Sequence, residues 1–120
     1  MSVKNKRIAV TTVVTEKEKN LFVAKARELG VPYNVIMRRL VRFLLDDKLS
    51  WFDLFKQYNE LSLADTQDKA KKRRMRSTLE PEQYTAFAQR AEEWGSTTAV
   101  IMRRLMMLYA AEKIEQRDIW

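Results

Sequence analysis

The sequence predicts a mainly helical domain assembled from two copies of one unit, in which a short strand is followed by two helices. The first observation is a repeated hexapeptide, Val-Ile-Met-Arg-Arg-Leu, at positions 35–40 and again at 100–105, an offset of 65. The second is that the only two glycines of the chain, Gly30 and Gly95, stand at the same offset. The third is length, because a unit of about 45 residues buries too little surface to be stable alone. We therefore expect both copies to share one core.

The first copy opens with a predicted strand at 8–15, where valine and threonine dominate. Thr15 is suited to cap the N-terminus of the helix that follows. Apolar residues then recur at helical spacings of four and three positions, namely Phe22, Ala26 and Leu29. We expect this helix to end at Gly30, because glycine adopts the left-handed conformation of helix C-termini without strain.

A second helix is predicted from about Tyr33 to Asp47, directly after Pro32. Apolar residues cover more than half of its circumference, which is typical of a core helix. The arginines of the hexapeptide suggest a nucleic-acid motif, but we favour a structural role for them as the polar stripe of two core helices: Arg38, Arg39, Arg103 and Arg104. The methionines of the same helices are interpreted as deformable core packing: Met37, Met102, Met106 and Met107.

The second copy repeats this plan. We predict a strand at about 73–79, a helix from about Pro81 to Trp94, a stop at Gly95, and a helix from about Thr98 to Glu112 that Thr97 caps.

The residues between the copies predict a short amphipathic helix followed by a polar linker at 63–70. Ser50 can cap a helix whose aromatic and leucine side chains recur three or four apart from Trp51 to Leu61. This helix either folds back over the core or offers a docking surface to a second protein or a second copy. The expected organisation is a first unit at 1–48, a linker with its helix at 49–70 and a second unit at 71–120.

Alternation along the second strand indicates which face is buried. Arg74 and Arg76 alternate with apolar residues, and two arginines cannot form a buried face, so Met75, Ser77 and Leu79 point inward. The offset of 65 transfers this assignment to the first strand. There the inward residues are Val10, Thr12 and Val14, and the outward residues are Ala9, Thr11 and Val13.

Composition limits the classes of function. There are 23 lysines and arginines against 16 acidic residues, a net charge of +7, which points to nucleic acid first and an acidic membrane surface second. Cysteine and histidine are absent, which removes disulfides, thiol nucleophiles, the usual zinc ligands and the commonest general base. We expect no enzymatic activity, no catalytic residues, no metal and no cofactor. The apolar run at 8–10 is too short for a signal peptide or a membrane span, so we expect a cytoplasmic protein without a membrane partner.

The order of strand, helix, glycine and helix in a basic unit of about 45 residues resembles the ribbon-helix-helix family of DNA-binding proteins. The spacing of 16 positions from Val14 to Gly30 and from Leu79 to Gly95 is similar to that family as well. The resemblance implies a mainly α fold with a two-stranded antiparallel β-ribbon, in which the two units form one pseudo-twofold module. Two units in one chain look like the TraY-type relaxosome accessory proteins of conjugative plasmids.

The resemblance also implies that outward strand residues enter the major groove of DNA. These residues are Ala9, Thr11, Val13, Arg74, Arg76 and Thr78. Arginine can donate two hydrogen bonds to guanine, threonine can bond in either direction, and the two apolar residues can cover thymine methyl groups. We favour base contact by the two arginines over a role as solvated charges. The apolar residues at positions 9 and 13 differ from the polar residues usual in the family.

The family grips phosphates with backbone amides at the start of the second helix. The matching residues here are Pro32, Tyr33 and Asn34 in one copy and Ser96, Thr97 and Thr98 in the other. Proline lacks an amide hydrogen, which weakens the first of these clamps. Basic residues that flank the strands are further candidates for phosphate contact, namely Lys6, Arg7, Lys72 and Arg73.

The expected function is sequence-specific binding of double-stranded DNA. The resemblance implies an accessory factor of plasmid conjugation that binds near a transfer origin, acts with a relaxase or other relaxosome proteins, and regulates transcription there. A plasmid, phage or chromosomal repressor is the alternative within the same class. In another class, the chain is an antitoxin that binds a toxin through the helix at 51–61. We expect a monomer in solution that can associate on DNA.

Overall fold

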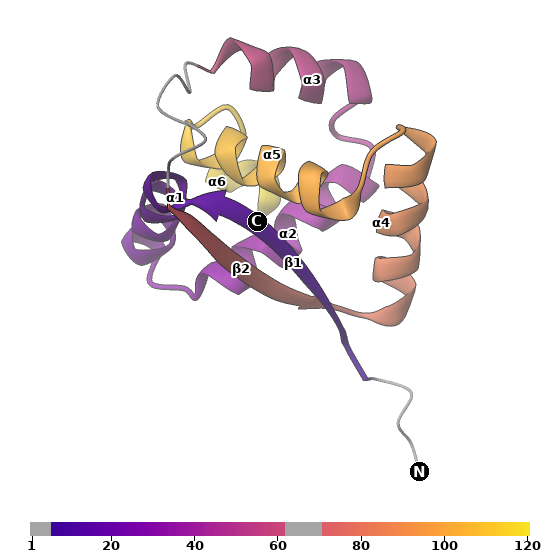
Figure 1. Cartoon of the computed structure of the whole chain (residues 1–120), viewed down its shortest axis with the longest axis horizontal. Coiled ribbons are helices and arrows are strands. Elements are labelled where there is room, and N and C mark those ends of the chain that lie inside the picture. Colours follow the sequence, from indigo (N-terminus) through magenta and orange to yellow (C-terminus); the bar gives the residue numbers. More distant parts are fainter. Residues whose placement is uncertain (1–5, 62–70) are drawn as a thin grey trace.

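The computed structural model of the chain describes residues 6–61 and 71–120. Its elements are β1 (Ile8–Thr15), α1 (Glu16–Leu29), α2 (Tyr33–Leu45), α3 (Trp51–Glu60), β2 (Lys72–Leu79), α4 (Pro81–Glu93), α5 (Thr98–Ala110) and α6 (Gln116–Ile119) (Figure 1). The fold is mainly helical with one two-stranded antiparallel sheet, as predicted. The predicted polar linker at 63–70 lies outside the described residues.

The two strands form an antiparallel ribbon whose register follows the sequence repeat. Thr11 lies opposite Arg76, and these two residues are equivalent under the offset of 65. Residues at alternate positions of both strands are buried, namely Val10, Thr12, Val14, Met75, Ser77 and Leu79. The inward face predicted from the arginines of the second strand is therefore confirmed for both strands.

The second helix of each copy packs against the strand of the other copy. Helix α5 contacts β1, and α2 contacts β2. The first helices cross over in the same way, since α1 packs against α5 and α4 against α2. Because the chain exchanges elements between the copies, the apolar faces of each copy are covered largely by the other. The buried apolar side chains of both copies accordingly form a single cluster.

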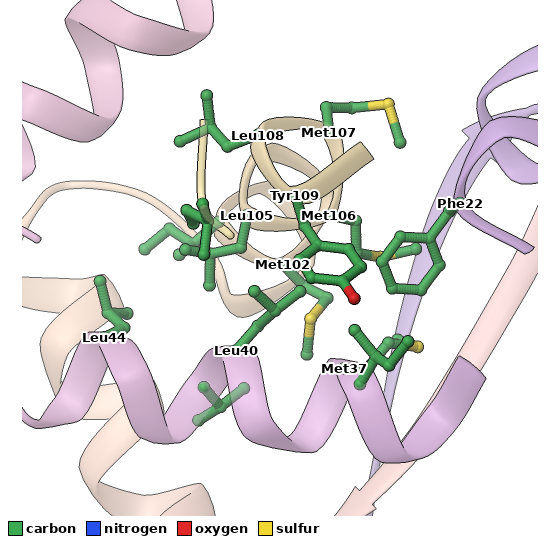
Figure 2. Close-up of a cluster of buried hydrophobic side chains, with 14 of the residues drawn as sticks. Phe22, Met37, Leu40, Leu44, Met102, Leu105, Met106, Met107, Leu108 and Tyr109 are labelled. Carbon is green, nitrogen blue, oxygen red and sulfur yellow. The ribbon is translucent and has the colours of Figure 1, made fainter. Parts of the chain in front are cut away.

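The centre of this core lies between α2 and α5. In Figure 2, Met37 and Leu40 of α2 point toward Met102 and Leu105 of α5. All four of these side chains are fully buried, and Met106 and Met107 are buried beside them. The prediction that the methionines fill the core is confirmed, and their flexible side chains suit the irregular space between two crossing helices.

Local signals fix the helix ends. Thr15 and Glu18 form a reciprocal capping box at the start of α1, and Thr97 caps α5. Gly30 and Gly95 adopt left-handed φ values of 73° and 65°, which terminate the first helices as predicted.

The second helices end two residues earlier than predicted. They stop at Leu45 and Ala110 because Asp47 and Glu112 adopt left-handed φ values of 60° and 63°, which a right-handed helix cannot contain. The sequence does not predict this turn, because neither Asp47 nor Glu112 is a glycine.

Helix α3 shows features of both predicted alternatives. Ser50 caps it, and its inner face packs on α5 through the fully buried Leu54. Its outer face carries Trp51, Phe52 and Phe55, which are 43%, 61% and 40% exposed. In Figure 1, α3 lies on the side of α5 away from the ribbon. The helix therefore covers the core and leaves an aromatic surface, which we call the α3 outer face.

Helix α6 is not among the predicted elements, although the repeat carries a signal for it. Ile119 and Trp120 stand 65 positions after Leu54 and Phe55. Ile119 is buried like Leu54, and Arg39 lies 4.2 Å over the Trp120 ring as Arg104 lies 5.8 Å over Phe55. The short C-terminal helix therefore occupies, in its own copy, the place that α3 occupies in the first.

Across residues 6–61 and 71–120, every helix falls short of the length or the apolar content that a membrane crossing requires.

Candidate nucleic-acid interface

The outward face of the ribbon gathers all six residues predicted for base contact on one surface. Ala9, Thr11 and Val13 are exposed on β1, and Arg74 and Arg76 are exposed on β2, where Thr78 is half-buried. The pairing places Thr78 opposite Ala9 and Arg74 opposite Val13, around the central pair of Thr11 and Arg76. Both rows therefore point away from the helices and can meet a ligand together. We call these six residues the outward ribbon face.

The two rows of this face differ in chemistry. The β1 row offers one hydroxyl between two apolar side chains, whereas the β2 row offers two guanidinium groups and a hydroxyl. Within the described residues, the side chains of Arg74 and Arg76 form neither an ion pair nor a hydrogen bond. Two unpaired cations side by side on an exposed strand leave their donors available to an anionic ligand.

Two of the four flanking basic residues are paired with carboxylates. Arg7 lies 3.3 Å from Glu80, and Arg73 lies 2.8 Å from Glu16. All four of these side chains are substantially exposed, and surface ion pairs of this kind contribute only about 0–1 kcal/mol. Phosphate oxygens can therefore compete for both arginines. Lys6 and Lys72 are exposed beside them.

The starts of α2 and α5 lie beside the ribbon, because a strand hydroxyl is bonded to each. Ser77 Oγ donates to the carbonyl oxygen of Asn34 at 2.7 Å, and Thr12 Oγ1 donates to that of Ala99 at 2.6 Å. The helix dipole and the free amides of a first turn favour an anion at these positions. Thr97 is exposed, and the other predicted residues with an amide hydrogen are half-buried, namely Tyr33, Asn34, Ser96 and Thr98.

Two of the predicted clamp positions have no free amide hydrogen in the structure. Pro32 has none by its chemistry, and it is the N-cap of α2 without a side-chain cap of its own. The Ser96 amide donates at 2.8 Å to the carbonyl oxygen of Ala91, in the turn that closes around the left-handed Gly95. Ser96 therefore has its hydroxyl, and not its amide, to offer a phosphate.

The four arginines of the hexapeptide all make contacts inside the chain. Arg39 donates to the Ile119 carbonyl at 3.2 Å, and Arg104 lies over the rings of Phe55 and Tyr58. Arg103 forms two hydrogen bonds with the buried carboxylate of Glu18, at 3.1 and 2.7 Å. The pKa of Arg103 is raised chiefly by this hydrogen bond. These contacts support the structural role that we favour for the repeated arginines.

The fourth of these arginines, Arg38, touches the ribbon itself, which the sequence pattern does not indicate. Its Nε donates to the carbonyl oxygen of Thr78 at 3.1 Å, and burial lowers the pKa of its guanidinium. Arg38 and Arg103 have different partners because the second copy carries Gln83 at the position where the first copy carries Glu18. Without a carboxylate at that position, Arg38 bonds to the backbone of β2. Periodicity places Arg38 on the polar stripe but cannot reveal a partner 40 residues away.

Nowhere in the described ranges do three or more acidic residues come together as metal ligands. Comparisons of the chain with models of protein families, with curated proteins and with solved structures found no match.

Proposed function

We propose that this protein binds double-stranded DNA in a sequence-specific manner, with the outward ribbon face in the major groove. The observation that carries the proposal is an exposed two-stranded ribbon that lies beside two helix starts and presents Arg74 and Arg76, whose side chains have no partner among the described residues. A two-stranded ribbon fits the width of the major groove, and arginine can donate two hydrogen bonds to guanine O6 and N7. Helix starts on both sides of the ribbon suit the phosphates that flank a groove.

We propose further that the two copies form a pseudo-twofold ribbon-helix-helix module. Support comes from contacts that recur at the offset of 65 with the copies exchanged. The ion pair of Lys25 with Glu112 has its counterpart in that of Arg90 with Asp47. The hydrogen bonds from Thr12 and Ser77 to the second helices form another such pair. Reciprocal contacts of this kind are what a twofold arrangement of two similar units produces.

Binding is tested by selecting sites from a library of random duplexes and measuring the affinity of the selected site. A specific protein of this class binds its site with a dissociation constant of about 10⁻⁸ to 10⁻¹¹ M and binds scrambled duplexes at least about a thousandfold more weakly. The affinity should fall steeply as salt rises, because phosphate contacts release counterions. A library that yields no enriched sequence, or equal affinity for selected and scrambled duplexes, would contradict sequence-specific binding.

For the biological role, we propose an accessory factor of plasmid conjugation that marks DNA near a transfer origin for a relaxase. The resemblance to TraY-type proteins supports this role, as does the α3 outer face, which lies away from the ribbon and stays accessible when the ribbon is on DNA. A repressor that acts alone uses the same ribbon but has no need of this aromatic surface. In vitro, addition of the purified relaxase with origin DNA should yield a ternary complex, and replacement of Phe52 by serine should weaken it without weakening DNA binding.

The α3 outer face also supports a second candidate, an antitoxin whose partner covers Trp51, Phe52 and Phe55. Exposed aromatic residues on one helix face are typical of protein contact sites. The two roles differ in what accompanies the protein. An antitoxin purifies with a small partner in equal amount, whereas an accessory factor or repressor purifies alone as a monomer and associates only on DNA.

A further inference from the structure

Two buried hydroxyl groups join the inward face of the ribbon to the helices behind it. Thr12 donates a hydrogen bond of 2.6 Å to the carbonyl oxygen of Ala99, and Ser77 donates one of 2.7 Å to that of Asn34. Thr12 and Ser77 are only 1% and 2% exposed. Thr12 is equivalent to Ser77, and Asn34 to Ala99, under the offset of 65. The same bond is therefore made once from each copy to the other.

Stability alone does not account for a hydroxyl at both positions. The inward residues two positions before and after Thr12 and Ser77 are all apolar, namely Val10, Val14, Met75 and Leu79. Threonine and valine have similar shapes, so a valine at position 12 would occupy the same space without a polar atom. A buried hydroxyl must give up its bonds to water before it gains its partner in the protein, so one such hydrogen bond adds only a small net stability. The repeated hydroxyls therefore indicate a geometric role.

Each bond ends on the turn that we assign to phosphate contact. Asn34 and Ala99 are the second residues of α2 and α5. On the other side, Thr12 and Ser77 are next in the chain to Thr11 and Arg76, the central pair of the outward ribbon face. One short hydrogen bond thus connects the residues that face the bases with the turn that faces a phosphate, in each half of the interface.

We propose that Thr12 and Ser77 are positioning residues, which hold the two helix starts at a fixed distance from the outward ribbon face. This inference rests on the proposed function, because DNA presents its bases and flanking phosphates at a fixed separation. A ribbon and two helix starts that are held in the matching geometry before binding lose little freedom on binding. The two hydroxyls themselves face the core and do not touch DNA.

Matched substitutions separate the hydroxyl from the packing. Thr12→Val and Ser77→Ala remove the hydroxyl, whereas Thr12→Ser and Ser77→Thr retain it. We expect the first pair to stay folded with only a modestly lower melting temperature, because one buried hydrogen bond adds little net stability, and to bind the selected duplex about tenfold more weakly. Their slope of log affinity against log salt should be shallower by about 0.9 for each phosphate that the protein no longer binds. The hydroxyl-retaining variants should show wild-type affinity and slope.

Two results with DNA would overturn the inference. One is wild-type affinity and salt slope in Thr12→Val and Ser77→Ala. The other is an equal loss of affinity in Thr12→Ser and Thr12→Val, which would show that packing matters and the hydroxyl does not. If Thr12→Val fails to fold, Ser77→Ala takes its place in the comparison, and failure of both to fold would overturn the inference by showing that the hydroxyls are needed for stability.

A measurement without DNA separates this inference from the proposed function. The amides of Val35 and Val100 are hydrogen-bonded within the two first turns. Hydrogen exchange at these amides should speed up in the variants that lack the hydroxyl, while exchange in the middle of α2 and α5 stays unchanged. Unchanged exchange at both amides would overturn positioning. If the wild-type protein binds no duplex while the variants that lack the hydroxyl show the faster exchange, only the proposed function is contradicted.

Discussion

The outward face of β2 presents two arginines and a threonine, whereas β1 presents an alanine, a threonine and a valine at the equivalent positions. On the inward side, by contrast, the two strands make the same kind of contact, with Thr12 and Ser77 bonded to equivalent carbonyl groups. A substitution on the inward side disturbs a core that both copies share, while a substitution on the outward side alters only one row of the surface. The two copies in one chain can therefore keep one fold and carry two different outward rows, which identical chains in a homodimer cannot.

The first helices differ as well. Glu18 of α1 is buried, caps its own helix together with Thr15, and binds Arg103 of the other copy. The equivalent position in α4 carries Gln83, and the equivalent arginine, Arg38, bonds to the backbone of β2 instead. One end of the core thus contains an ion pair where the other contains a neutral side chain.

The largest effect that we expect concerns this pair of positions. Glu18→Ala should lower the free energy of unfolding by about 3 kcal/mol, because it removes a helix cap and leaves Arg103 partly buried without its carboxylate. Gln83→Ala should change it by less than about 0.5 kcal/mol. Urea denaturation of both variants measures the difference. Similar destabilisation of the two variants would mean that the copies are equally sensitive there, contrary to the asymmetry of the contacts.

The next effect concerns the outward ribbon face. Arg74→Ala and Arg76→Ala should each weaken binding to the selected duplex by about 1–3 kcal/mol while the melting temperature stays unchanged, as expected for exposed arginines that bond to guanine. Thr11→Ala on the β1 row should weaken binding to the selected duplex by a smaller amount. Titrations with selected and scrambled duplexes provide the control, because substitution of arginines that touch only phosphates would weaken binding to both duplexes equally.

The difference between the rows also predicts an asymmetric DNA site. The half that faces β2 should contain guanine and be strictly specified, with penalties of about 1–3 kcal/mol for each base-pair change. The half that faces β1 should be rich in A·T pairs and tolerate substitution, through thymine methyl contacts or groove shape. Affinities for every single base-pair change of the selected site measure this. Equal penalties at symmetry-related positions would indicate that two chains bind as a symmetric pair.

The last prediction is that dilution leaves the thermal stability of the protein unchanged. Because both strands of the ribbon belong to one chain, the midpoint of thermal denaturation should stay constant over a roughly hundredfold dilution. Sedimentation of the free protein should give the mass of a monomer. A midpoint that falls on dilution would show that folding requires association between chains. The contacts between the two copies would then include contacts with a second molecule.

Much of the fold is predictable because the signals are local. Thr15 and Thr97 cap helices, Gly30 and Gly95 end them, and the arginines of the second strand reveal its buried face. Each of these depends on neighbours within a few positions. The antiparallel pairing of the strands is implied only by the family resemblance, since no pattern within one strand specifies its partner.

The remainder of the site depends on residues far apart in the sequence. The bond from Thr12 crosses 87 positions, and that from Arg38 to β2 crosses 40. Periodicity identifies the buried or polar face on which such a residue lies, but it cannot specify which backbone carbonyl will be within reach. The roles of the outward residues toward DNA stay predictions for the same reason, because they depend on a partner outside the chain.

The exchange of elements between the copies has a consequence during synthesis on the ribosome. When the first copy has emerged, β1 and the apolar face of α2 still lack β2 and α5, which they contact in the folded protein. The methionine-bearing face of α2 must therefore stay uncovered in the nascent chain until β2 and α5 have been translated. We expect a chain truncated before α5 to leave this apolar surface exposed and therefore to be prone to aggregation.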